Sequence, residues 1–139
     1  MITYNKEITF EDYNEIRTLV GWNTLSRRQF DAMMKNSSFI TVAHDGEKAV
    51  GISRGVGDGG YHLMLVDVIV HPDYQGQGIG RSVVEQFMAY ADSTIEPGEW
   101  ISLTLLSVYG KEDFYKKFGF HTRPTGTEGA GMNLKYVKK

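Results

Sequence analysis

The chain is 139 residues long, is 41% hydrophobic, contains no cysteine and carries a formal net charge of −2. This length predicts a single domain over residues 1–139 with a sizeable core. No apolar run approaches the roughly 18 residues of a membrane span, and the weak negative charge gives no support for nucleic-acid binding. Without cysteine, a disulfide framework and an acyl-cysteine intermediate are both excluded.

Two further features narrow the class of protein. The first residues lack a charged stretch followed by an apolar core, so we expect no secretion signal and a cytoplasmic protein. The histidines lie far apart without the spacing of metal ligands, so we expect surface or turn histidines and no metal site. They are His44, His62, His71 and His121.

The N-terminal part of the chain predicts one strand and two helices. Residues 2–8 are typical of a strand. Residues 9–21 predict a helix that Thr9 caps, and residues 26–35 predict a second helix that Ser26 caps. The residues expected on the inner faces of these helices are Ile16, Leu19, Val20, Phe30, Met33 and Met34.

The middle of the chain predicts three strands in succession. Residues 39–44 and 49–56 are joined by Asp45-Gly46, which is a strong hairpin signal. A second glycine-rich turn at residues 57–60 leads to the next strand at residues 61–70. Antiparallel pairing of these strands is therefore expected.

A glycine-rich turn follows the strand at residues 61–70. Gly76, Gly78 and Gly80 come at every second position, and a helical pattern begins at Ile79 and is expected to run to about residue 93. Its inner face is predicted to hold Val83, Val84, Phe87, Met88 and Ala91. At such a strand-to-helix turn, free N–H groups lie at the positive end of the helix dipole, which favours binding of a diphosphate.

The rest of the chain predicts a strand at residues 100–108, a short helix at 111–117 and closing strands at 120–122 and 132–137. Together the elements indicate a mixed α/β sheet with helices on both faces.

Two well-known nucleotide motifs do not match the glycine-rich turn. A dinucleotide fingerprint needs a third glycine where Arg81 stands, and the turn lacks the Gly-Lys-Ser/Thr ending of a Walker loop. Gln75-x-x-Gly78-x-Gly80 instead resembles the R/Q-x-x-G-x-G/A signature of the GNAT superfamily of N-acetyltransferases. A turn without a ligand is the alternative.

A second segment resembles the F-Y-x-x-x-G-F segment of the same superfamily. It reads Phe114-Tyr115-Lys116-Lys117-Phe118-Gly119-Phe120. The resemblance covers roughly residues 40 to 123, and it implies a mixed, mostly antiparallel sheet of about six to seven strands with about four helices. It also implies acetyl-coenzyme A as co-substrate and direct attack by an amine in a ternary complex.

The resemblance implies where the cofactor binds. The strand that ends at Val70 splays from its neighbour and offers backbone groups near Val68 and Val70 to pantetheine, while the turn holds the pyrophosphate. Arg81 either adds a charge-assisted bond or pairs with Glu85. The expected cofactor-binding residues are Val68, Ile69, Val70, Gln75, Gly76, Gln77, Gly78, Ile79, Gly80 and Arg81.

Acyl transfer to an amine needs an oxyanion donor, an acid and a proton acceptor. The donor is expected to be a backbone N–H near Val68. Tyr115 matches the tyrosine that serves as the acid in many GNAT enzymes, and a core aromatic is the alternative. Two departures, Val108 in place of a frequent asparagine and Lys111 in place of a small residue, put the pantetheine contacts near Tyr109 in doubt.

The proton acceptor is open at this point. The glutamate that many relatives carry on the central strand corresponds here to Val66, but Asp67 lies next to it in an apolar run. An unpartnered charge there is costly, so Asp67 is a candidate base or a site for the cationic amine. An ion pair with Arg54 is an equal alternative, and Asp58 and His62 are weaker candidates.

The sequence says little about which amine accepts the acetyl group. Trp22 lies near a loop in the region that covers the acceptor site in the resembled family; it either forms a pocket wall or caps the core. An aromatic wall with Asp67 suits a small primary amine. A protein lysine, an N-terminal amine and a non-catalytic acyl-coenzyme A-binding module are the alternatives, and a homodimer is common in the family.

Overall fold

The computed structural model describes residues 1–139 in full. It divides into two compact units, Met1–Leu105 and Leu106–Lys139, which we describe separately. The first unit holds the sheet and three helices; the second holds one short helix and a long irregular segment. One domain over residues 1–139 therefore stays a prediction.

A five-stranded sheet in the order β1-β2-β3-β4-β5 forms the centre of the first unit. All neighbours pair antiparallel except β4 and β5, which are parallel. This confirms the mixed, mostly antiparallel sheet. The strands are β1 (Ile2–Asn5), β2 (Phe39–Asp45), β3 (Lys48–Gly57), β4 (His62–Val70) and β5 (Ser102–Leu105).

The sheet has fewer strands than expected. Residues 120–122 and 132–137, which we predicted as closing strands, form no strand, and β5 is shorter than its prediction at 100–108. Met132, Leu134 and Tyr136 alternate as in a strand, but their side chains are exposed. A period of two indicates only that a segment suits a strand; a ladder also needs a partner edge, which local sequence does not encode.

The helices of the first unit are α1 (Phe10–Leu19), α2 (Arg27–Asn36) and α3 (Ile79–Ser93), and a single 3-10 turn, η1, spans Pro72–Tyr74. The Thr9 hydroxyl accepts a hydrogen bond from the Asp12 N–H, and the Ser26 hydroxyl accepts one from the Gln29 N–H. Both predicted N-caps are therefore confirmed. None of the helices is long and apolar enough to cross a bilayer.

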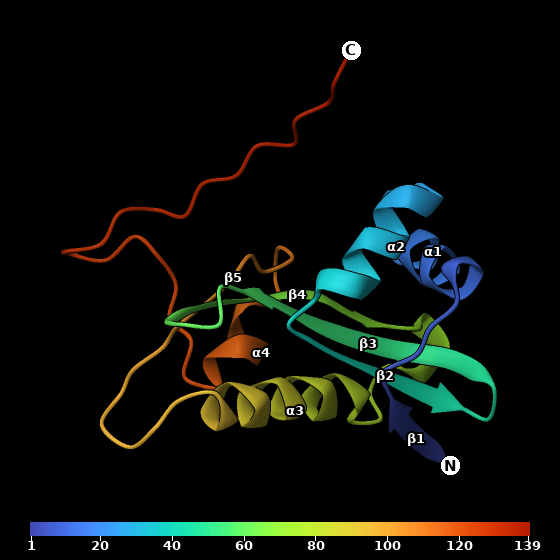
Figure 1. The fold of residues 1–139 in the computed structure, drawn as a ribbon, viewed down its shortest axis with the longest axis horizontal. Coiled ribbons are helices and arrows are strands. Elements are labelled where there is room, and N and C mark those ends of the chain that lie inside the picture. The colour runs from blue at the N-terminus through green and yellow to red at the C-terminus, as the bar shows by residue number, and fades with distance from the viewer. The chain divides into compact units, whose positions relative to one another are not determined.

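Helices α1 and α2 cover one face of the sheet (Figure 1). Phe30 packs against Tyr13 with ring centroids 5.4 Å apart, and Ile16 and Val20 also contact this core. Leu19, predicted on the inner face, is 44% exposed. The side chains of α1 and its C-cap residue that face the core are instead those of Tyr13, Ile16 and Val20. Tyr13 and Val20 share one face because seven residues make almost two helical turns. Met33 and Met34 pack at its edge.

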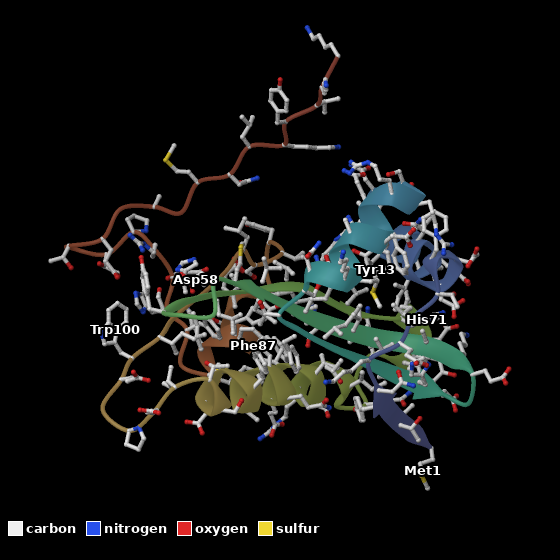
Figure 2. All side chains as sticks on the ribbon, in the orientation of Figure 1. Met1, Tyr13, Asp58, His71, Phe87 and Trp100 are labelled. Atoms are coloured by element: carbon white, nitrogen blue, oxygen red, sulfur yellow. The ribbon has the colours of Figure 1, made fainter.

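Helix α3 covers the opposite face, and Figure 2 shows Tyr13 and Phe87 on the two sides of the sheet. Four of the five residues predicted on its inner face are buried, and Met88 is half-buried. The buried ones are Val83, Val84, Phe87 and Ala91.

Small residues on β3 allow α3 to lie close to the sheet. A Cβ at Gly51 would lie 2.7 Å from Ile79 Cγ2, and one at Gly55 would lie 3.1 Å from Phe87 Cε1. Between them, the Ser53 hydroxyl donates to the Val83 carbonyl at 2.8 Å. This close contact holds the first residue of α3 against β3 and so positions the glycine-rich turn before it.

The second unit contains α4 (Glu112–Lys116), close to the predicted helix at 111–117. Its aromatic side chains pack edge to face. The Phe114 ring lies 5.0 Å from Tyr115 and 5.5 Å from Phe118, and Tyr115 lies 6.4 Å from Phe120. The F-Y-x-x-x-G-F segment therefore forms a small aromatic cluster.

Candidate active site

The glycine-rich turn requires glycine for its backbone conformation. Gly78, the N-cap of α3, has φ 85°, and Gly76 has φ 79°. These values lie in the left-handed region, which side chains other than glycine rarely adopt. A Cβ at either position would meet no atom within 4 Å. The turn is therefore open to its surroundings, and it is the backbone conformation that demands glycine.

Six consecutive backbone N–H groups of this turn, residues 76–81, have no acceptor within the chain. The first hydrogen bond of α3 runs from the Ser82 N–H to the Gly78 carbonyl at 3.0 Å. Gly76, Gln77 and Gly78 are exposed. Because these N–H groups also lie at the positive end of the α3 dipole, the turn has the properties of an anion site that fits a diphosphate.

The connection from β4 to this turn is held by specific side chains. The backbone N–H of the buried His71 donates to the Val50 carbonyl at 2.8 Å, and its side-chain Nδ1 accepts from the Asp73 N–H at 3.1 Å. The Tyr74 hydroxyl donates to Asp45 Oδ2 at 2.5 Å. His71 is therefore a turn histidine with a structural role.

Two of the predicted cofactor-binding side chains have partners inside the protein. Gln75 Nε2 donates to the Val70 carbonyl at 3.1 Å. Arg81 Nε donates to Glu85 Oε1 at 2.9 Å, and both side chains are largely exposed. The i,i+4 pair, which the sequence left as an alternative for Arg81, is present.

A bulge interrupts β4 three residues before its end. The register passes from Arg54↔Val66 to Ile52↔Ile69, so that Asp67 and Val68 together lie opposite a single residue of β3. Asp67 has φ 53°. An extra residue in the left-handed conformation is one of the known ways to form a bulge.

The bulge reverses the direction in which the β4 backbone groups point. Before it, Tyr61 accepts from the Ser102 N–H, so odd-numbered residues face β5, and the His62 carbonyl accepts from Asp58 on the β3 side. After it, the His71 N–H donates to β3. Since successive residues alternate, Val68 and Val70 point away from β3.

The edge toward which Val68 and Val70 point has no paired strand. Pairing between β4 and β5 ends at Leu65↔Leu105. The backbone N–H groups of Val68 and Val70 therefore lie along an unpaired stretch of β4, while the Val70 carbonyl accepts from Gln75. This is the splayed arrangement that the family resemblance implies, and the stretch is connected to the glycine-rich turn by η1.

The Asp67 carboxylate lies in a cluster of cations on the α1 side of the sheet. Its Oδ2 accepts from the Tyr13 hydroxyl at 2.6 Å and from Arg54 Nε at 2.7 Å. Its Oδ1 accepts from Arg17 Nη1 at 3.2 Å. The Asp67 and Arg54 side chains are 10% and 13% exposed. The ion pair with Arg54 is therefore present, with a second arginine beside it.

This cluster does not offer a free negative charge. Burial, with the nearby Asp67 carboxylate, raises the pKa of Tyr13 to about 12, so the phenol is neutral at physiological pH. One carboxylate then faces two guanidinium groups, Arg17 and Arg54. The geometry favours the ion-pair interpretation of Asp67 over attraction of a cationic amine or proton abstraction.

Trp22 joins the same cluster through Arg17. The Arg17 guanidinium carbon lies 5.4 Å from the Trp22 ring centroid, and the half-buried Trp22 packs against the core under α1 and α2. The two residues predicted to bind the acceptor, Trp22 and Asp67, thus both contact Arg17. Arg17 and Tyr13 were missed by sequence reasoning, although their i,i+4 spacing on one helix was visible.

The remaining titratable candidates differ in their surroundings. Burial raises the pKa of Tyr115, so its hydroxyl keeps its proton at neutral pH, as an acid must. Asp58 Oδ1 accepts from the N–H groups of Gly60 and His62, which lower its pKa and make it a weak base. His62 is exposed at the start of β4, about 20 Å along the strand from Val68.

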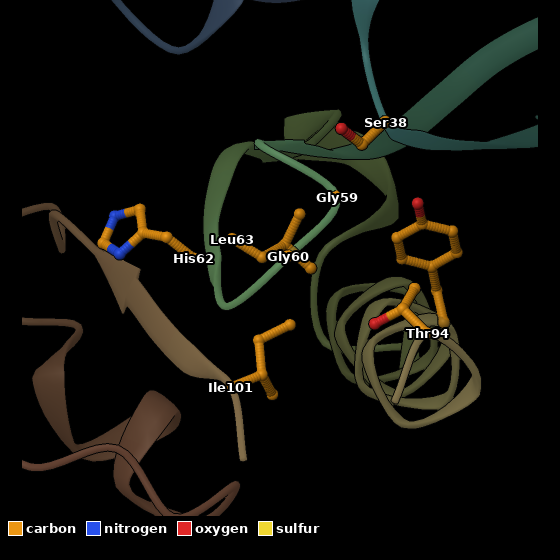
Figure 3. A pocket seen from close by; sticks show the side chains of 8 residues that line it. Ser38, Gly59, Gly60, His62, Leu63, Thr94 and Ile101 are labelled. Carbon is orange, nitrogen blue, oxygen red and sulfur yellow. The ribbon is translucent and has the colours of Figure 1, made fainter. Parts of the chain in front are cut away.

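A shallow hollow lies at the end of α3 that is remote from the glycine-rich turn. Figure 3 shows Leu63 and Ile101 beside the Gly59-Gly60 turn, with Thr94 near the end of α3. Four of its lining residues carry polar side chains, and none of the expected cofactor-binding residues lines it; of the candidate catalytic residues, only His62 does. Groups of three or more His, Asp or Glu side chains placed to hold a metal ion do not occur in the structure.

Comparison with known proteins decides the family. The family model described as "Acetyltransferase (GNAT) domain" matches residues 36–122, which include both the glycine-rich turn and the aromatic segment. The chain belongs to the GNAT acetyltransferase family. It is therefore an N-acetyltransferase by family, and the two motifs quoted from the sequence indicated this correctly.

Similar proteins agree with this assignment. An uncharacterized N-acetyltransferase, ycf52, of Pyropia yezoensis is 30% identical over 92% of this chain and 74% of its own length. A solved structure of a probable acetyltransferase from Staphylococcus aureus is 30% identical, has a TM-score of 0.85, and covers 98% of this chain and 100% of that one.

Two relatives carry names that state an acceptor. Histone acetyltransferase TAP1 of Glycine max is 25% identical over 88% of this chain and 56% of its own length. Serotonin N-acetyltransferase 2 of Oryza sativa is 26% identical over 84% of this chain and 58% of its own length.

Proposed function

We propose that this GNAT protein transfers an acetyl group from acetyl-coenzyme A to a primary amine by direct attack in a ternary complex. One observation carries the proposal: β4 is unpaired on its β5 side at Val68–Val70, and after the single turn η1 the chain presents six free N–H groups at residues 76–81. An extended arm that ends in a diphosphate matches this sequence of donors.

The cofactor-binding residues follow from this arrangement. The N–H groups of residues 76–81 would hold the pyrophosphate, and the Val68 and Val70 backbone would pair with pantetheine and the thioester. The Ile69 side chain is buried in the core, so we expect Ile69 to hold the neighbouring β4 residues in place and not to contact the cofactor with its side chain. The Gln75 and Arg81 side chains are engaged inside the protein, so their expected contribution is through the backbone N–H of Arg81 and the shape of the turn.

The chemistry balances with the groups assigned. A neutral amine nitrogen attacks the thioester carbonyl, a C–N bond forms, and the oxyanion is stabilised by the Val68 N–H. The oxyanion then collapses and the C–S bond breaks; the cationic nitrogen releases one proton to solvent water, and the departing thiolate takes a proton from the Tyr115 hydroxyl, which water reprotonates. Asp67, predicted as a base, already accepts hydrogen bonds from three donors, so the proposal gives it no proton transfer.

For the acceptor we propose a small primary amine. Trp22, three residues after the end of α1, supplies an aromatic surface in the region that covers the acceptor in the resembled family. The name of the rice relative supports an arylalkylamine, and that of the soybean relative supports a protein amine. Both kinds of amine therefore belong in the first assay.

That assay measures release of coenzyme A thiol from acetyl-coenzyme A with tyramine, tryptamine, spermidine, amino acids and a lysine peptide. The protein contributes no thiol background, because it contains no cysteine. Saturable turnover with one amine class is the expected result. Cofactor binding, seen as a raised melting temperature, without turnover on any amine would favour a non-catalytic acyl-coenzyme A-binding module.

Tyr115→Phe tests the proposed acid. We expect kcat to fall about 100-fold, with acetyl-coenzyme A affinity nearly unchanged, because only protonation of the leaving thiolate is lost. Tyr136→Phe, at a side chain that is 80% exposed, is the matched control. An unchanged kcat in Tyr115→Phe would make Tyr115 a core aromatic.

A further inference from the structure

Asp67 has a backbone conformation that residues other than glycine adopt infrequently. It is the single residue other than glycine with positive φ, at 53°, and its side chain is 10% exposed. The left-handed conformation is unfavourable for an L-residue, although aspartate adopts it more readily than most. Contacts from the surrounding structure must therefore hold it there.

Three side chains, Tyr13, Arg17 and Arg54, supply those contacts, and we call them the Asp67 clamp. Tyr13 and Arg17 come from successive turns of α1, and Arg54 comes from β3. Two members of the clamp are themselves held: Arg54 Nη1 donates to the Ser37 hydroxyl at 2.7 Å, and Arg17 Nε donates to the Asn23 carbonyl at 2.5 Å. The carboxylate is thus fixed from two elements at once.

The clamp matters because of what the bulge does to the next residue. The Leu63 side chain lies on the face of the sheet that α3 covers, because it and Phe87 of α3 both lie next to Gly55. In a regular strand, the Asp67 side chain would lie on this same face. The Val68 N–H would then point toward β3. With the bulge, Asp67 turns toward α1 and the Val68 N–H turns to the unpaired edge.

We propose that Asp67 is a positioning residue: its clamped carboxylate holds the bulge that directs the Val68 N–H toward the thioester oxygen. This rests on the proposed acyl transfer. Asp67 touches neither substrate nor cofactor and moves no proton. The residue that sequence reasoning selected as a base therefore acts through the backbone of its neighbour.

Three substitutions separate this role from that of a base. Asparagine at position 67 tolerates positive φ and still accepts hydrogen bonds. Glycine tolerates positive φ but has no side-chain acceptor, and alanine has neither property. For positioning we expect kcat to fall in the order Asp67→Asn, Asp67→Gly, Asp67→Ala, with Asp67→Ala about 10- to 100-fold below wild type. The KM for acetyl-coenzyme A should change little, and the shape of the pH profile should be retained.

A base would behave differently. All three variants would then be equally slow, and the acidic limb of the kcat/KM profile would disappear, which would overturn the proposal. A lower melting temperature with wild-type kcat, measured well below that temperature, would also overturn it. Asp31→Asn, at an exposed i,i+4 pair with Arg27, is the control and should leave kcat unchanged.

A binding measurement tests the same inference without turnover. In amide NMR spectra, we expect acetyl-coenzyme A and coenzyme A to shift the Val68 signal differently, because only the first carries the thioester oxygen. The difference should shrink in Asp67→Gly and vanish in Asp67→Ala, while the signals of residues 76–81 respond as in wild type. A full Val68 response in Asp67→Ala would overturn the proposal.

The two failures are distinguishable. If the signals of residues 76–81 do not respond to acetyl-coenzyme A in the wild type, the proposed function fails. If they respond and Val68 does not, only the role of Asp67 fails. Should Asp67→Ala not fold, Tyr13→Phe removes one clamp contact while keeping the buried ring, and it should reduce the Val68 difference and kcat by a smaller factor.

Discussion

The glycine-rich turn and the β4 bulge both place a backbone in the left-handed region next to the same stretch of chain, but they do so by different means. In the turn, Gly76 and Gly78 adopt φ values of 79° and 85°, and a Cβ at either position would meet no atom within 4 Å. In the bulge, Asp67 adopts φ 53° under three side-chain contacts. The turn depends on the residue type at each position, whereas the bulge depends on residues more than ten positions away.

This difference teaches how the two halves of the cofactor site respond to change. A substitution in the turn acts locally on backbone conformation and leaves the core intact. A substitution in the clamp acts through packing between α1, β3 and β4, and therefore on stability as well. The following predictions break or sharpen that distinction.

The largest expected effect is a pH dependence of stability that belongs to the clamp. Burial and the Asp67 carboxylate raise the pKa of Tyr13 from its ordinary value of about 10 to about 12. The folded state thus holds this proton more tightly, and the contribution is fully present below pH 10 and is lost as pH rises toward 12. A shift of this size corresponds to about 2–3 kcal/mol.

Urea unfolding of wild type and Tyr13→Phe between pH 9 and 11.5 measures it. We expect the stability advantage of the wild type to decrease steadily across this window, because only the wild type ionises at position 13. Parallel curves for the two proteins would show that Tyr13 is not a clamped, neutral phenol.

Next in size is the close approach of α3 to β3, which connects the two regions. A Cβ at Gly51 would lie 2.7 Å from Ile79 Cγ2, so Gly51→Ala must displace the first residue of α3. We expect a loss of about 1–3 kcal/mol in the free energy of unfolding and weaker acetyl-coenzyme A binding. Thermal unfolding and calorimetry measure the two effects.

Gly129→Ala is the control for this substitution, because a Cβ there meets nothing within 4 Å. It should change neither stability nor binding. Unchanged cofactor affinity in Gly51→Ala would mean that the turn tolerates a shift of α3.

A smaller effect is expected for the turn itself. Gly78→Ala forces an L-residue to φ 85°, at about 1–2 kcal/mol. Because the turn can relax away from its binding conformation, we expect about a tenfold loss of acetyl-coenzyme A affinity with little change in the core. Titration calorimetry measures the affinity.

Gly46→Ala provides a matched comparison at another open position, with φ 62° in the β2–β3 hairpin. It should lower stability by a similar amount and leave cofactor affinity unchanged. Equal affinity losses in both variants would indicate a general effect of stability and not of the turn.

The smallest effect is expected for Arg81→Gln. The Arg81–Glu85 pair is exposed, and its loss should change the free energy of unfolding by less than about 0.5 kcal/mol. Acetyl-coenzyme A affinity should fall by no more than a few-fold, since the proposed contact runs through the backbone N–H. A large, salt-sensitive loss of affinity would instead show that the guanidinium leaves Glu85 to bind the cofactor.

Local sequence determined the family, the glycine-rich turn, the course of α3 and the N-caps Thr9 and Ser26. Each of these depends on residues within one or two turns of one another: on the period of apolar residues, on a hydroxyl three residues before an N–H, or on glycine where φ is positive. Helix α3 was therefore predicted over 79–93 and begins and ends at those residues.

Tertiary structure alone decided the rest. The bulge at Asp67 and Val68 arises from the register between β3 and β4, and the partners of the Asp67 carboxylate come from α1 and β3. The segment at 132–137 alternates like a strand but has no ladder partner. A pattern along the chain indicates which secondary structure a segment favours. Strand pairing and ion pairs depend instead on which distant residues the fold brings together.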